Sequence, residues 1–408
     1  MYVEKQSTLI NIMGQSPIRQ IGFTLLELLV ALTLGLVIIG ELLQILLSSR
    51  QAYRLQEAVG QLQESAQVAL PLLVAEIRSA GYLGCQSNLT KFADNFHNTL
   101  NVASNPLAYR FAYPVQGYEY GGTSSGDDYS PTADPHPGDA HQWTPPLPAP
   151  LAGRALAGSD VLVVRRAGLE PLILRGTPYA GNATTLTATS PTLLGGELDK
   201  KSFAPGQIVV ASDCANTVVF QITRRQDGGG TTTFSHGPTT LTPGNALQDW
   251  PAAWWLRATP GASIAPAVTT LFYVGRHFPD NADPEDRFAL YSISLDGNGR
   301  FASAQERVAG IENMQIRYGV DRDGDLAVNA YLDAATVEGQ GLWEQVVSVQ
   351  IAFLLATTEK GLLPHPLAQR YALNGGDTSP LATHIISIPD GRLRRVVQTV
   401  VTLRNRTL

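Results

Sequence analysis

A run of 25 residues near the start of the chain, from Phe23 to Leu47, holds seventeen large apolar side chains and two acids, Glu27 and Glu41. These apolar side chains contribute about −5 to −10 kcal/mol to membrane insertion, whereas a carboxylate costs about 3 kcal/mol at the bilayer centre and less near an end. As a helix, the run is long enough to cross a hydrocarbon layer of ~30 Å. The sequence therefore predicts a membrane-spanning helix over residues 23–47. A secretory signal peptide fits less well, because the run is long and no small-x-small cleavage site follows it.

The chain becomes polar after Leu47 but keeps a helical period. Apolar residues recur in steps of three and four, which predicts an amphipathic continuation of the same helix over residues 48–80: Ala52, Leu55, Val59, Leu62, Ala66, Ala69 and Leu73. Pro71 removes one backbone donor and is expected to kink the helix without ending it. Gly81 supplies the stop signal.

The remainder, residues 81–408, has the pattern of a β-rich region. Short β-branched or aromatic runs are separated by Gly, Pro and Asp turns, and they predict strands at 161–164, 208–210, 218–222, 270–274, 288–293, 314–318, 346–355 and 396–403. We therefore expect an α+β fold in which a long N-terminal helix packs on one antiparallel sheet, with a second β-rich portion attached. Two segments rich in Gly, Pro, Ser and Asp, residues 114–153 and 225–248, are expected to be long surface loops.

The charge pattern and the motifs argue against nucleic-acid binding and against nucleotide-driven work by this chain. The net charge is −6, and no basic stripe occurs outside the short C-terminal segment that begins at Leu393, so nucleic acid is not expected as a partner. The sequence also contains no P-loop, the motif that binds the phosphates of ATP or GTP. Any movement driven by nucleotide hydrolysis would therefore take its energy from another protein.

The start of the apolar run carries a specific resemblance. Gly22, Phe23 and Thr24, then Glu27, are followed by "LLVALTLGLVIIG", and this pattern is similar to the class III signal of type IV pilins and type II secretion pseudopilins. The resemblance implies that residues 1–22 are a leader, that a prepilin peptidase cuts between Gly22 and Phe23 and methylates Phe23, and that Glu27 becomes the fifth mature residue. In a filament, Glu27 would neutralise the new amine at Phe23 and so register the helices, because an unpaired charge in an apolar core is costly.

Further phrases along the chain narrow the resemblance to minor pilins of the PilW type. They are "ALPLLVAEIRSAGYLGC" from Ala69, "GSDVLVVRRA" from Gly158, "IVVASDCANTVVFQIT" from Ile208, "VAGIENMQIRYGVDRDGD" from Val308 and "LRRVVQTVVTLRNR" from Leu393. The resemblance implies a pilin-like, non-enzymatic protein of the bacterial inner membrane with a periplasmic C-terminal region, which reaches the cell surface in the pilus. It implies a role in priming the filament or in its tip complex, with other minor pilins, the major pilin, the assembly platform and a large tip adhesin as partners. A type II secretion pseudopilin, or a membrane-anchored hydrolase or ligand-binding module, is the alternative.

The chain has two cysteines, Cys85 and Cys214, too few for a zinc site of thiolates alone. They are either two buried free thiols or a disulfide. Export of residues 81–408 favours the disulfide, which would close a long loop and contribute roughly 4 to 5 kcal/mol in the chain-entropy model.

Three carboxylates at alternate positions of a turn, Asp321, Asp323 and Asp325, suit the hard oxygen ligation of Ca²⁺, with Asn329 or Asp333 and a backbone carbonyl completing the shell. The alternative is a solvated acidic hairpin, because Leu326 and Leu332 stand where an EF-hand loop has its Gly and Glu. No cofactor is required by any other pattern.

Other chemical patterns are weak. Gly122 to Gly126 matches G-x-S-x-G but lacks the flanking strand and helix of a nucleophile elbow. The cluster of Asp134, His136, Asp139 and His141 is interrupted by prolines and is read as solvated loop. Trp254 and Trp255 are interpreted as core or interface anchors.

Overall fold

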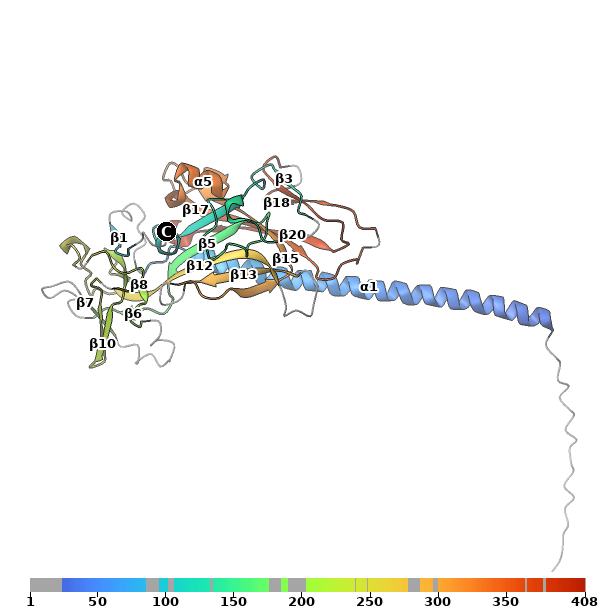
Figure 1. Cartoon of the computed structure of the whole chain (residues 1–408), viewed down its shortest axis with the longest axis horizontal. Helices are drawn as coiled ribbons and strands as arrows, with labels where there is room; N and C mark the ends of the chain where they lie inside the picture. The colour runs from blue at the N-terminus through green and yellow to red at the C-terminus, as the bar shows by residue number, and fades with distance from the viewer. Residues whose placement is uncertain are drawn as a thin grey trace, which may run out of the picture. The chain divides into compact units, whose positions relative to one another are not determined.

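The computed structural model describes residues 24–85, 95–101, 106–132, 135–175, 185–189, 203–238, 240–247, 249–277, 287–295, 300–363, 365–376 and 379–407. The chain divides into two compact units, Met1–Gln56 and Glu57–Leu408. Figure 1 shows the order of the elements along the chain.

Helix α1, Leu25–Ser79, confirms the long helix expected from the sequence. It continues through Pro71 and ends just before Gly81, whose φ of 72° is a conformation that glycine adopts without strain. The apolar side chains of its first half are exposed, and they include nearly every large hydrocarbon residue from Leu25 to Leu47. This stretch is long and apolar enough to cross a membrane.

The second half of α1 is amphipathic, with one face in the core. Its buried residues are Ala58, Leu62, Ala69, Leu73 and Ile77, at spacings of four and seven residues. The predicted stripe was right from Leu62 onward and wrong before it: Val59 is 44% exposed, whereas Ala58 is 5% exposed. Ala58 and Val59 are both apolar, and Val59, the larger of the two, is the one that faces outward.

The larger sheet has ten strands. Its main path contains, in spatial order, β1 (Phe96–Asn98), β9 (Thr217–Gln221), β8 (Ile208–Ser212), β12 (Ser263–His277), β5 (Val161–Ala167), β2 (Val115–Tyr120) and β4 (Trp143–Thr144). Three further strands join beside it: β13 (Arg287–Ser294), β14 (Gln305–Ala309) and β6 (Leu172–Ile173). The 15-residue β12 holds the sheet together, because its first residues pair with β8 and its later residues pair with β5 and β13.

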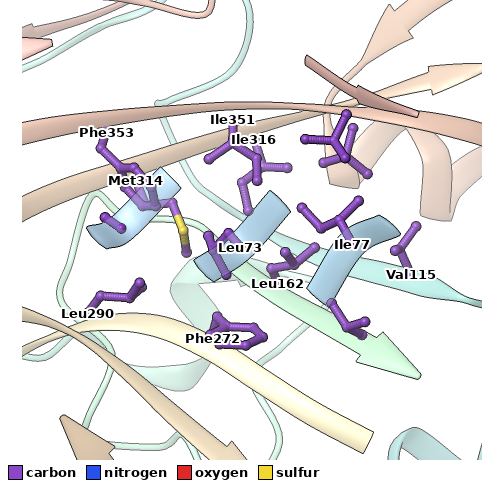
Figure 2. Packing of buried hydrophobic residues seen from close by; sticks show 14 of the residues in the cluster. Leu73, Ile77, Val115, Leu162, Phe272, Leu290, Met314, Ile316, Ile351 and Phe353 are labelled. Carbon is purple, nitrogen blue, oxygen red and sulfur yellow. The ribbon is translucent and has the colours of Figure 1, made fainter. Parts of the chain in front are cut away.

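A second, antiparallel sheet contains β16 (Ala330–Leu332), β15 (Ile311–Val320), β17 (Val346–Ala356) and β20 (Arg394–Thr402). The second half of α1 lies between this sheet and the larger one. Figure 2 shows Leu73 and Ile77 with Ile316 and Ile351 of the second sheet on one side and Leu162 and Phe272 of the larger sheet on the other. The expectation of one sheet against the helix was thus incomplete, because the helix is covered from two sides.

Two small sheets complete the structure. One contains β10 (Arg224–Gly228), β11 (Thr231–Ser235) and β7 (Thr185–Thr189); the other contains β18 (Arg370–Leu373), β19 (Thr383–Ile386) and β3 (Asp128–Tyr129). The remaining helices are short: α3 (Pro106–Tyr109), η3 (Ala140–Gln142), η5 (Ala252–Trp254), α5 (Ala334–Gln340), η6 (Trp343–Gln345) and α6 (Arg404–Thr407). All eight predicted strands coincide with strands of the structure, and the α+β class is confirmed.

Both predicted loops contain strands, which corrects the sequence interpretation. Segment 114–153 begins with β2, whose six residues are all buried in the larger sheet. Gly117 in this strand lies against the Tyr318 hydroxyl, and a Cβ there would collide with the ring. Segment 225–248 begins with the β10–β11 hairpin. Turn residues dominate both segments in number, and they concealed the short strands beside them.

Of the two expected tryptophan anchors, Trp254 packs against a buried core cluster. Trp255 is 37% exposed and Trp254 is half-buried against His97, with ring centroids 4.2 Å apart. Trp250 is the buried one, stacked on His236 at 3.9 Å. Trp250 belongs to the same core cluster and was not singled out from the sequence.

Candidate functional site

The described part of the chain begins at Thr24, directly after the predicted processing positions. Gly22 and Phe23, the predicted cleavage and methylation positions, lie outside the described residues, as does the predicted leader. Thr24 and Glu27 are described and form a reciprocal capping box. The Thr24 amide and hydroxyl both donate to the Glu27 Oε2 at 3.0 Å, and the Glu27 amide donates to the Thr24 Oγ1 at 3.2 Å.

The capping box gives Glu27 a role within its own chain. The first amides of a helix have no intrahelical acceptor, and a Thr followed three residues later by Glu satisfies two of them. The carboxylate therefore marks the start of the apolar helix. It lies at the surface of α1, where a group from another helix can reach it.

The cysteines join the end of α1 to the larger sheet. Cys85 and Cys214 form a disulfide across 129 residues of sequence, with Cα atoms 4.7 Å apart. Cys214 lies in the turn between β8 and β9 with a φ of 71°. The link fixes the residues just after α1 to this turn.

The acidic turn follows β15 and brings its three carboxylates together. Ligand oxygens of Asp321, Asp323 and Asp325 all lie within 4.8 Å of one another. The Asp321 carboxylate already accepts from the amides of Gly324 at 2.7 Å and Leu326 at 2.9 Å. Desolvation acts to raise the pKa of Asp321, but these amide bonds outweigh it and lower the pKa.

The residues expected to complete a Ca²⁺ shell have other partners. Asn329 donates from its side chain to Asp323 at 3.2 Å and accepts from the Arg322 amide. Asp333 caps α5 by accepting from the Thr336 amide at 2.8 Å. The turn thus brings three candidate ligands together, while backbone hydrogen bonds account for its geometry. A surface pocket of about 420 Å³ lies beside it, lined in part by Asp321, Asp323 and Arg406.

The weaker motifs have structural explanations where they are described. Asp139 caps η3 by accepting from the His141 amide, so this pair shapes a loop. Asp134, the first member of that predicted cluster, lies outside the described residues. Gly122 to Gly126 forms turns after β2 with no helix behind it. In the described part of the chain, the acidic turn is the one group of three His, Cys, Asp or Glu residues close enough to share a metal ion.

The sequence interpretation missed a buried acid pair. Glu119 on β2 and Asp160, which precedes β5, are 3% and 2% exposed. Asp160 accepts from the amides of Tyr120 and Ile316 at 3.2 and 2.8 Å, whereas the Glu119 Oε2 has no hydrogen-bond partner. Burial raises the pKa of Asp160 to about 8 and raises the pKa of Glu119, which the nearby Asp160 charge raises further. The only sequence signal was an acid in each of two otherwise strand-like phrases.

Two family models match the chain. Residues 18–40 match the prokaryotic N-terminal methylation motif, and residues 272–405 match type IV pilus-assembly protein W. The first match spans Gly22 to Glu27, and the second runs from the latter part of β12 to α6. Comparison with curated proteins and with solved structures gave no match.

The methylation motif and the exposed apolar helix are features of pilin-like proteins, and they support a membrane-anchoring N-terminus. Within that class, the two matches support a minor pilin of the PilW type. This is a family of pilus-assembly components and not of enzymes, and such a component contacts other pilus proteins.

Proposed function

We propose that this chain is a minor pilin that primes filament formation or forms part of the tip complex of a type IV pilus. A prepilin peptidase cuts it between Gly22 and Phe23 and methylates Phe23. Before assembly it is held in the inner membrane by α1 with residues 81–408 in the periplasm. After assembly it lies in the pilus, in contact with other minor pilins, the major pilin, the assembly platform and a large tip adhesin.

One observation carries this proposal: Glu27 stands at the start of an exposed, membrane-length helix inside a matched methylation motif. In the single chain, Glu27 is occupied by Thr24. A new amine at Phe23, on the same helix or on a neighbour, is a stronger partner because its full positive charge adds a Coulomb attraction to the carboxylate that the neutral Thr24 donors do not supply. Glu27 would exchange its cap for this amine during assembly.

Intact-mass analysis of the membrane-extracted protein tests the processing step. We expect a species that begins at N-methyl-Phe23 and contains an oxidised Cys85–Cys214 pair. A mature protein that retains residues 1–22 would exclude a pilin role.

Substitution tests the assembly step, and the helix offers a matched control. Glu27→Gln should leave processing intact and reduce incorporation into pili at least tenfold, since a buried charge left without its partner costs about 3 to 5 kcal/mol. Glu41→Gln, in the same apolar helix, should assemble normally. Thr24→Ala removes the cap but keeps the carboxylate. If this variant assembles as well as the wild type, assembly depends on pairing of Glu27 with the amine and not on helix capping. Normal assembly of Glu27→Gln would contradict the proposal.

A type II secretion pseudopilin shares the methylation motif, whereas the match over residues 272–405 favours the pilus. Deletion of the gene distinguishes them. We expect loss of surface pili and twitching with normal exoprotein secretion, and the reverse pattern would favour the pseudopilin.

A further inference from the structure

The small sheet of β10, β11 and β7 has one apolar face and one face of hydroxyl groups. Leu186, Ala188 and Phe234 are fully buried on the apolar face. The strand register places the opposite side chains in two adjacent rows, and these define the hydroxyl face: Thr185, Thr187 and Thr189 on β7, and Thr231, Thr233 and Ser235 on β11. Each of the six is half-buried, as expected for side chains that stand close together on an open sheet.

The hydroxyl face is regular because both strands alternate. Thr189 pairs with Thr231, Thr187 with Thr233, and Thr185 with Ser235. Rows of this kind repeat at about 6.8 Å along a strand and about 4.8 Å between strands. The Thr187 and Thr233 hydroxyls lie 3.3 Å apart and can share one proton, which leaves acceptor capacity on both.

Arginines border the hydroxyl face on both sides. Arg224 on β10 pairs with Ser235, and Arg175 donates its backbone amide to the Thr187 carbonyl at 2.9 Å on the far side of β7. Both side chains are exposed, and neither forms an ion pair with a described carboxylate. At about 4.8 Å per strand and with an offset of two residues along the strands, the two arginine backbones are about 16 Å apart across the face.

Among the described residues of the face, no acid balances these charges. Asp227 is the one carboxylate in β7, β10, β11 and residues 172–175, and the register places it on the apolar side, where it pairs with Arg225 at 3.0 Å. The hydroxyl face is therefore positively charged and rich in groups that both donate and accept hydrogen bonds.

We propose that the hydroxyl face binds an anionic polysaccharide of the polyuronate class. Hydroxyl side chains match the hydroxyls of sugar rings, and guanidinium groups form paired hydrogen bonds with uronate carboxylates. A protein partner fits poorly, because Ile173 is the one large apolar side chain that borders the face among the described residues, and interface cores are rich in apolar and aromatic residues. A single-stranded nucleic acid fits poorly as well, since the strands carry one aromatic residue, Phe234, and it is buried on the other side.

The experiment measures binding of the full chain in detergent micelles to immobilised polygalacturonate, with dextran as the neutral glycan. We expect saturable binding to polygalacturonate that weakens with salt, and no binding to dextran. Arg175→Gln with Arg224→Gln should weaken binding at least tenfold, since a hydrogen bond to a charged group is worth about a factor of ten or more. Thr187→Val with Thr233→Val keeps the side-chain shape and should weaken binding several-fold.

Matched controls lie on another sheet. Arg395 and Thr399 on β20 are an exposed guanidinium and a half-buried hydroxyl, and Arg395→Gln with Thr399→Val should bind like the wild type. The arginine variants change exposed side chains only, so melting curves should match the wild type and exclude misfolding. The proposal is overturned by a folded wild type that does not bind polygalacturonate, by equal binding to dextran, by unchanged binding of the arginine variants, or by an equal loss in the control variant. These readouts are independent of pilus assembly, so failure here leaves the proposed function standing.

Discussion

The buried acid pair should make the stability of this protein depend on pH in an unusual direction. A carboxyl whose pKa is raised in the folded chain is protonated there while it is ionised in the unfolded chain, so unfolding releases protons. The stabilising contribution is complete below the unfolded pKa, near 4, and is lost as the pH rises towards the folded pKa, which for Asp160 is about 8. Arg317 faces the pair and opposes this effect, whereas Asp333 adds to it.

The magnitude follows from the number of protons. Each such carboxyl changes the free energy of unfolding by about 1.4 kcal/mol per pH unit between the two pKa values. Asp160 should therefore contribute a decrease of about 1.4 kcal/mol per pH unit between pH 5 and pH 7, and Glu119, whose pKa is also raised, adds a decrease of the same sign. Glu119→Gln keeps the shape and the Thr123 contact but cannot ionise, so the decrease in the free energy of unfolding per pH unit should be smaller than in the wild type.

Urea denaturation of the detergent-solubilised chain, followed by tryptophan fluorescence at pH 5, 6 and 7, measures these slopes. The difference between wild type and Glu119→Gln reports the titration of Glu119 together with its effect on Asp160. Glu344→Gln, at an exposed acid, should keep the wild-type slope. Identical slopes for wild type and Glu119→Gln would refute the reasoning, because Glu119 would then be ionised equally in both states.

Three further predictions follow from the packing and the turns. Leu73→Ala, in the helix between the two sheets, should lower the free energy of unfolding by about 2 to 5 kcal/mol, whereas Val59→Ala on the exposed side should change it by less than about 1 kcal/mol; chemical denaturation compares them. Cys214→Ser should lower the free energy of unfolding by about 2 to 5 kcal/mol relative to the oxidised wild type, and it should be as stable as the reduced wild type. Thermal melting of both proteins with and without reductant tests this. We also expect millimolar Ca²⁺ to raise the melting temperature of the wild type but not of Asp323→Asn; equal melting in Ca²⁺ and in EGTA would exclude a calcium site in the acidic turn.

Local sequence was sufficient for the long helix and for the strands. The run from Phe23 to Leu47 predicted α1 because twenty or more consecutive apolar residues have few alternatives to a membrane-length helix. The eight predicted strands were recognised because β-branched runs between turn residues carry their own local signal. The matched methylation motif is likewise local, since it lies within residues 18–40.

Only the tertiary structure decided which sheets and side chains pack against α1. The sequence could not show that α1 is covered by two sheets, because each apolar strand is compatible with packing on either side of the helix. It placed Val59 in the core in place of Ala58, since neighbouring stripes of a helix differ by one position.

The same limit applies to the polar groups. Glu119 and Asp160 are 41 positions apart in sequence and come together only through the pairing of β2 with β5 and the packing of β15. The hydroxyl face arises from the register of β7 with β11, which depends on hydrogen bonds across more than forty residues. Secondary structure and processing signals are thus written in consecutive residues, whereas burial, charge pairing and surface chemistry depend on contacts that only the folded chain creates.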